Sequence, residues 1–177
     1  MIGIEPALKP AVHAGGHPRV LVMATPMTLR EEKFHALMQR FESDAEILRL
    51  PCPGLVEYVE QGVLEGAELE AFLANLFEPY QSHPVDCVVL GCTHYPMLKA
   101  LIGGVIGHNV LLVSSAEEMA KEVRETLSMR GELAHEGNIA KHEFFTSAPN
   151  LDEFQSFGSR VFSEPIERPT HIDLSRL

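Results

Sequence analysis

Two kinds of hydrophobic pattern alternate along the chain. Short runs that are wholly apolar or that alternate with polar residues predict four β-strands, at 20–24, 45–50, 85–90 and 109–115. Stretches with apolar residues three and four positions apart predict four helices, at 28–41, 67–80, 95–106 and 115–131. Strands that alternate with helices over short connections predict an α/β fold with a mainly parallel sheet.

Several residues predict where these helices begin and end. Thr28 with Glu31, and Ser115 with Glu118, have the spacing of a capping box, and Gly131 predicts the end of the last of these helices. Pro96 fits the first turn of the helix at 95–106. The proline- and glycine-bounded stretch at 52–62 predicts a loop with one helical turn.

The elements predicted at the two ends of the chain are too few to form a complete layer of secondary structure. After Gly131 the pattern predicts a polar loop, a strand at 142–147, a helix at 150–162, and a loop with a short final strand. The first five residues, MIGIE, predict a strand with no element before it. We therefore expect residues 6–113 to form a complete parallel-sheet lobe, and residues 1–5 and 114–177 to form part of a second α/β lobe.

Composition and charge exclude several classes of protein. The 177 residues carry a net charge of −11 with scattered basic residues, so the chain lacks the positive surface that nucleic-acid binding needs. The sequence contains no apolar run long enough for a membrane span and no signal peptide at its start. The three cysteines predict no disulfide framework, and they favour a reducing cytoplasm. Because they lack the spacing of a zinc site, they also predict no bound metal.

The candidate chemistry lies at the end of the strand at 85–90. Cys92, Thr93 and His94 follow this strand, and ligands of open α/β sheets bind beyond the carboxyl ends of strands. A helix that begins near Pro96 would direct free N–H groups to the same place, and with His94 it would favour a thiolate at Cys92. On the residues alone, a catalytic role and a structural role for Cys92 both stay open.

Five stretches of the sequence resemble one family. LGCTHYPML at 90–98 is similar to the second cysteine motif of the glutamate racemases, cofactor-independent members of the aspartate/glutamate racemase superfamily. The resemblance extends in the same order through a further four stretches: GIEPALKPA, CPGLVEYVEQG, LLVSSAEEMAKEV and HEFFTSAPNLDEF. It implies interconversion of L- and D-glutamate, which supplies D-glutamate for bacterial peptidoglycan.

The resemblance also implies a mechanism and a set of site residues. One cysteine thiolate removes the α-proton from one face of the amino acid, and a second cysteine thiol returns a proton to the other face. On this resemblance Cys92 is the base that acts on the L-enantiomer, while Thr93 and His94 bind substrate and assist it. Glu60 matches a glutamate that would tune His94, although an exposed carboxylate without that role stays open. No cofactor or metal is implied, and a homodimer is compatible with this assignment.

The sequence departs from the family in one respect. It contains no D-S-G, G-D-T or C-N-T motif, and C-N-T carries the first catalytic cysteine of the family. Cys87 precedes Cys92 on the same strand by more than about 15 Å, and Cys52 matches a cysteine outside the catalytic pair. We therefore expect this chain to be an incomplete racemase that comes from a truncated gene model, and to be inactive by itself. Two alternatives are a shortened homologue that acts by binding or association, and a related decarboxylase or isomerase with one thiol.

Overall fold

The structure is a computed structural model that describes residues 7–13 and 15–176. The expected strand at 1–5 lies outside the described residues. The chain forms two compact units, one up to Leu133 and the other from Ala134 onward, and each is described by itself.

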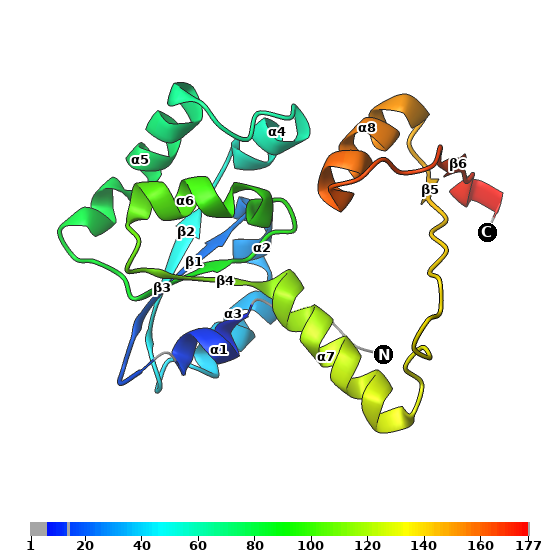
Figure 1. Ribbon diagram of the computed structural model, residues 1–177. Helices are drawn as coiled ribbons and strands as arrows, with labels where there is room; N and C mark the ends of the chain where they lie inside the picture. The colour runs from blue at the N-terminus through cyan, green and yellow to red at the C-terminus, as the bar shows by residue number, and fades with distance from the viewer. Residues whose placement is uncertain (1–6, 14, 177) are drawn as a thin grey trace. The chain divides into compact units, whose positions relative to one another are not determined.

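The first unit is built on a four-stranded parallel sheet (Figure 1). Its strands have the order β2-β1-β3-β4, with bounds β1 (Arg19–Ala24), β2 (Glu46–Pro51), β3 (Cys87–Leu90) and β4 (Leu111–Ser114). Ala24 pairs with Pro51, and Met23 pairs with Leu90, so neighbouring strands end nearly level with one another. The predicted α/β fold with a parallel sheet is confirmed.

Helices cover both faces of this sheet. In Figure 1, α1 (Leu8–Val12) and α3 (Glu32–Gln39) lie on one face, and α5 (Ala67–Gln81) and α6 (Lys99–Ile106) lie on the other. Val20 and Val22 of β1 pack in a buried cluster with α1 and α3. Side chains alternate along a strand, so Leu21 and Met23, also fully buried, face the opposite helices. Burial on both faces explains why the two central strands, β1 and β3, are almost continuously apolar.

The predicted helix at 28–41 is two helices. α2 (Pro26–Arg30) ends where Glu31 adopts an extended conformation, and α3 begins at Glu32. The side chain that caps α2 is Thr25, whose Oγ1 accepts a hydrogen bond from the Thr28 N–H at 3.2 Å. The predicted capping box of Thr28 and Glu31 is therefore wrong, because Pro26 at the first helical position starts the helix earlier.

Three further elements differ in detail from the prediction. The stretch at 52–62 contains α4 (Leu55–Glu60), and the helix expected at 95–106 begins as a 3₁₀ segment, η1 (Tyr95–Leu98), before α6. α7 (Ser115–Arg130) ends at Gly131 in the left-handed conformation, as predicted. Its capping box is wrong, because Ser115 Oγ accepts a hydrogen bond from the Ala7 N–H at 3.1 Å instead.

The sequence prediction assigned the residues of α7 to the second lobe. In the structure, α7 contacts β4 and belongs to the first unit, whose boundary lies after Leu133. The expected lobe boundary after Val113 stays a prediction. No helix in the described part of the chain is both long enough and apolar enough to cross a membrane.

The second unit contains the elements expected after the polar loop. β5 (Phe145–Thr146) pairs in parallel with β6 (Thr170–His171), and α8 (Leu151–Phe162) connects them; η2 (Leu174–Arg176) follows. Asn150 caps α8 by accepting a hydrogen bond from the Glu153 N–H at 3.2 Å. A two-stranded sheet with one helix has few buried side chains of its own, so this unit is less densely packed than the first.

Candidate functional site

Cys92 lies just beyond the carboxyl end of β3, where Gly91 continues the pairing with β1. The Gly91 N–H donates a hydrogen bond to the Met23 carbonyl oxygen at 2.9 Å. A Cβ atom at position 91 would lie 2.7 Å from that same oxygen, which is closer than real Cβ atoms approach backbone. Gly91 therefore lets the two strands stay paired to their ends while the chain turns and leaves the Cys92 side chain partly exposed.

The turn after Gly91 brings the thiol and the imidazole side by side. Cys92 Sγ lies 3.6 Å from His94 Nδ1, and Thr93 Oγ1 lies 3.4 Å from the same nitrogen. Two backbone hydrogen bonds close the turn, from the Tyr95 N–H to the Cys92 carbonyl at 3.3 Å and from Met97 to His94 at 3.2 Å. The contact between the thiol and the imidazole thus follows from local backbone geometry.

Glu60 reaches the same imidazole from a different part of the chain. It is the last residue of α4, and its Oε1 lies 3.5 Å from His94 Nε2. The chain turns sharply after it, with Gly62 at a φ of 79° and the Val63 N–H bonded to the Tyr58 carbonyl at 2.8 Å. Carboxylate, imidazole and thiol therefore form one row. The Glu60 side chain is 61% exposed, so this contact contributes little to stability.

Cys52 occupies the corresponding position after β2 but in a buried environment. Its N–H donates to the Ala24 carbonyl at 3.1 Å, and its thiol donates to the Leu50 carbonyl at 3.3 Å. Burial raises the pKa of the Cys52 thiol to about 12, although the nearby Tyr95 hydroxyl acts in the opposite direction. That hydroxyl is itself buried and has no hydrogen bond of ordinary geometry within the described residues.

Cys87 is the first residue of β3 and lies in the cluster beneath α1 and α3. Burial raises the pKa of its thiol to about 12 as well. Cys52 and Cys87 are therefore both buried thiols. Of the three cysteines, Cys92 alone is partly exposed.

The expected helix start near Cys92 is wrong in its placement. The 3₁₀ segment Tyr95–Leu98 follows Cys92, and the α-helix begins only at Lys99. His94, rather than the amino end of a long helix, is the group beside the thiol. Sequence reasoning also missed the burial of Tyr95, which anchors this segment in the core with no exposed surface. The apolar spacing of Tyr95, Leu98 and Ile102 is the signal that could have shown it.

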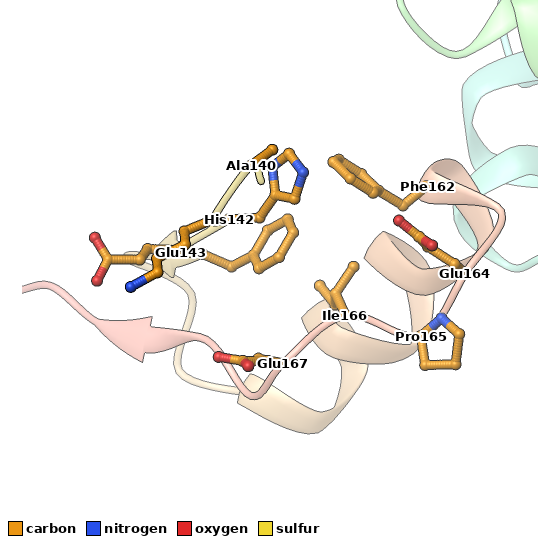
Figure 2. A pocket seen from close by; sticks show the side chains of 10 residues that line it. Ala140, His142, Glu143, Phe162, Glu164, Pro165, Ile166 and Glu167 are labelled. Atoms are coloured by element: carbon orange, nitrogen blue, oxygen red, sulfur yellow. The ribbon is translucent and has the colours of Figure 1, made fainter. Parts of the chain in front are cut away.

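The first unit contains a hollow, and the second unit contains another. The first, of about 730 Å³, lies at the carboxyl ends of β1 and β2, and Thr25, Arg30, Cys52 and Glu57 are among its lining residues. The second, of about 450 Å³, lies in the second unit (Figure 2). There the His142 and Phe162 rings face each other edge to face, with centroids 5.2 Å apart. Neither hollow contains the Cys92 side chain.

The chain is similar to known proteins in both sequence and structure. No protein-family model matches it. Curated relatives include the glutamate racemase of Clostridium acetobutylicum, 44% identical over 127 residues, which is 72% of this chain and 49% of the relative. The glutamate racemase of Clostridium novyi is 39% identical over 161 residues, which is 91% of this chain and 62% of the relative.

Solved structures agree with these relatives. Glutamate racemase RacE1 of Bacillus anthracis has a TM-score of 0.81 and 26% identity, over 97% of this chain and 63% of its own. The Escherichia coli glutamate racemase, solved with L-glutamate and the activator UDP-MurNAc-ala, has a TM-score of 0.76 and 26% identity, over 96% of this chain and 64% of its own. The chain belongs to the glutamate racemase family. It spans about half to three-fifths of the length of the curated relatives named above.

Proposed function

We propose that this chain provides one of the two proton-transferring sides of a glutamate racemase, with Cys92 as its thiol. The observation that carries the proposal is the row of Cys92, His94 and Glu60 at the carboxyl edge of the sheet, in a chain of the glutamate racemase family. The E. coli relative was solved with L-glutamate, which supports glutamate as the substrate.

The proposed reaction is two proton transfers with no cofactor. The Cys92 thiolate takes the α-proton of L-glutamate, and the electron pair of the broken C–H bond stays on the α-carbon. A second thiol then gives a proton to the opposite face, which produces D-glutamate and leaves that sulfur as a thiolate. His94, 3.6 Å from the sulfur, accepts the thiol proton beforehand, and Glu60 holds the imidazole in place. Thr93 provides a hydroxyl for the substrate.

The second thiol of this mechanism does not come from the other cysteines of the chain. Cys52 and Cys87 are both buried, with pKa values raised to about 12. We therefore expect the 177-residue chain by itself to form no D-glutamate. The role proposed for the complete site is to supply D-glutamate for peptidoglycan. The free cysteines support a reducing cytoplasm, and a homodimer is part of the proposal.

A chimaera tests the proposal directly. This chain would replace the matching part of the C. novyi racemase, to which it is 39% identical, so that the relative supplies the remainder of the site. We expect the purified chimaera to convert L-glutamate to D-glutamate, as measured by chiral chromatography. Cys92→Ala should lower the rate at least about a thousandfold, because it removes one of two obligatory proton carriers. Cys87→Ala is the matched control and should keep the activity.

The outcomes separate the alternatives. A folded chimaera without racemisation would favour a non-catalytic homologue that acts by association. Racemisation that survives Cys92→Ala would remove Cys92 from the mechanism. Loss of carbon dioxide from the amino acid, or a product other than D-glutamate, would favour the decarboxylase or isomerase with one thiol.

A further inference from the structure

The thiol and the imidazole at the end of β3 have a second chemical property, which is independent of racemisation. Cysteine thiolate and neutral histidine are the preferred ligands of borderline-soft divalent cations such as Zn²⁺. We propose that Cys92 and His94 together form a reversible two-ligand site for Zn²⁺, and that metal bound there blocks the thiol. The proposal rests on side-chain geometry and does not require that the proposed function be correct.

The distance between the two ligand atoms fits one tetrahedral ion. With Zn–S about 2.3 Å and Zn–N about 2.05 Å, a tetrahedral angle places sulfur and nitrogen about 3.6 Å apart. Cys92 Sγ and His94 Nδ1 are 3.6 Å apart. One zinc ion can therefore be coordinated by both atoms with only small rotations of their side chains, exchanging the contacts that Nδ1 makes with Cys92 and Thr93 for a metal bond.

Glu60 provides the support that a metal-binding histidine needs. Such histidines usually donate their other ring N–H to a carboxylate, which fixes the tautomer and the ring orientation. Glu60 Oε1 lies 3.5 Å from His94 Nε2, on the side of the ring away from the thiol. A proton held on Nε2 by this carboxylate leaves the Nδ1 lone pair directed toward Cys92, where the metal would bind.

Access and coordination number define what kind of site this is. Cys92 is partly exposed, and the His94 side chain is 24% exposed, so a hydrated cation can reach both. No group of three potential ligands of the Cys, His, Asp or Glu type was found in the described part of the chain. Two coordination positions thus stay with water or a small anion, which is typical of reversible binding. The thiol releases its proton to solvent when the sulfur–metal bond forms.

Titration with Co²⁺, a spectroscopic substitute for Zn²⁺, tests the site on the reduced, metal-free chain. We expect a thiolate-to-cobalt charge-transfer band that saturates at one ion per chain and disappears when Zn²⁺ is added. Cys92→Ser should remove the band, and His94→Asn should weaken binding at least about tenfold. Glu60→Gln should weaken it less than His94→Asn does, by about tenfold at most, because the carboxylate behind the ligating histidine is mostly exposed.

Matched controls come from the same chain. Cys87→Ala removes a buried thiol, and His108→Asn removes an exposed histidine outside the site; both should bind Co²⁺ as the unmodified chain does. Circular dichroism establishes that each variant is folded.

A measurement on the unmodified chain covers the case in which a variant does not fold. Zn²⁺ should slow the iodoacetamide modification of Cys92, followed by mass spectrometry of its peptide, by at least about tenfold. The proposal is overturned by absence of the charge-transfer band at millimolar Co²⁺, by a band that persists in Cys92→Ser, by unchanged affinity in His94→Asn, or by Cys92 modification that Zn²⁺ does not slow.

Discussion

Two turns of this protein each follow a parallel strand and carry a cysteine, but the two thiols lie in different environments. The turn after β2 and the turn after β3 both place a cysteine within two residues of the end of a parallel strand. Cys52 is 1% exposed, and its thiol donates a hydrogen bond to the Leu50 carbonyl, whereas Cys92 is partly exposed beside His94. The position at a strand end is therefore not enough to make a thiol reactive.

The residues that follow each cysteine account for the difference. After Cys52, Pro53 and Gly54 lead into α4, whose Leu55 and Val59 are fully buried. After Cys92, a polar pair, Thr93 and His94, precedes the buried Tyr95. Burial disfavours the charged thiolate, while a neighbouring imidazole and access to water favour it. The local turn and its neighbours therefore decide whether a thiol at a strand end is buried or partly exposed beside an imidazole.

The largest expected difference between the two turns is in thiol reactivity. A thiol with a pKa of about 12, as at Cys52, is ionised in only about one molecule in ten thousand at pH 8. We expect iodoacetamide to modify Cys92 at least about a thousandfold faster than Cys52 in the folded chain, as measured by peptide mass spectrometry. The two rates should converge in urea. Equal rates in the folded chain would show that the turns do not differ chemically.

The backbone of the turn after β3 depends on Gly91. In Gly91→Ala the new methyl group meets the Met23 carbonyl, so we expect the free energy of unfolding to fall by about 2–3 kcal/mol. Gly104→Ala is the matched control, because a Cβ atom at this position in α6 meets nothing within 4 Å. It should raise the stability by about 0.5–1 kcal/mol. Urea denaturation measures both; equal effects would mean that the close approach at Gly91 is unimportant.

We expect the His94 imidazole to account for part of the difference in reactivity between Cys92 and Cys52. We expect His94→Asn to slow the modification of Cys92 by about tenfold, because the thiol loses its neighbouring proton acceptor. Glu60→Gln should slow it only about two- to threefold, since the Glu60 side chain is mostly exposed. The control is Glu70→Gln, an exposed carboxylate on α5, which should leave the rate unchanged. A larger effect from Glu60 than from His94 would reverse the order of roles proposed for the two residues.

The smallest expected effect concerns the buried hydroxyl near Cys52. Tyr95→Phe removes a hydroxyl with no hydrogen bond in the described structure, so the free energy of unfolding should stay the same or rise by about 1 kcal/mol. Tyr58→Phe removes a solvent-exposed hydroxyl that donates to Glu68 at 2.9 Å, and should lower the free energy of unfolding slightly. Thermal and urea unfolding compare the two. A loss of stability in Tyr95→Phe would show that its hydroxyl does have a partner.

The sequence by itself determined the features that depend on neighbouring residues. Periodicity placed β1 to β4, α5 and α8, because burial on one face repeats every two residues in a strand and about every 3.6 in a helix. The order Cys92, Thr93, His94 also put a thiol next to an imidazole, since one turn joins them. These predictions needed no knowledge of distant contacts.

Only the tertiary structure decided the rest. It brought Glu60 to within 3.5 Å of His94 and gave the Ser115 hydroxyl a hydrogen bond from the Ala7 N–H in place of a capping role. It also buried Cys52 while Cys92 stayed accessible. Each of these outcomes depends on how strands and helices far apart in the sequence pack together, and a periodic pattern of side chains carries no information about which distant group fills the space beside it.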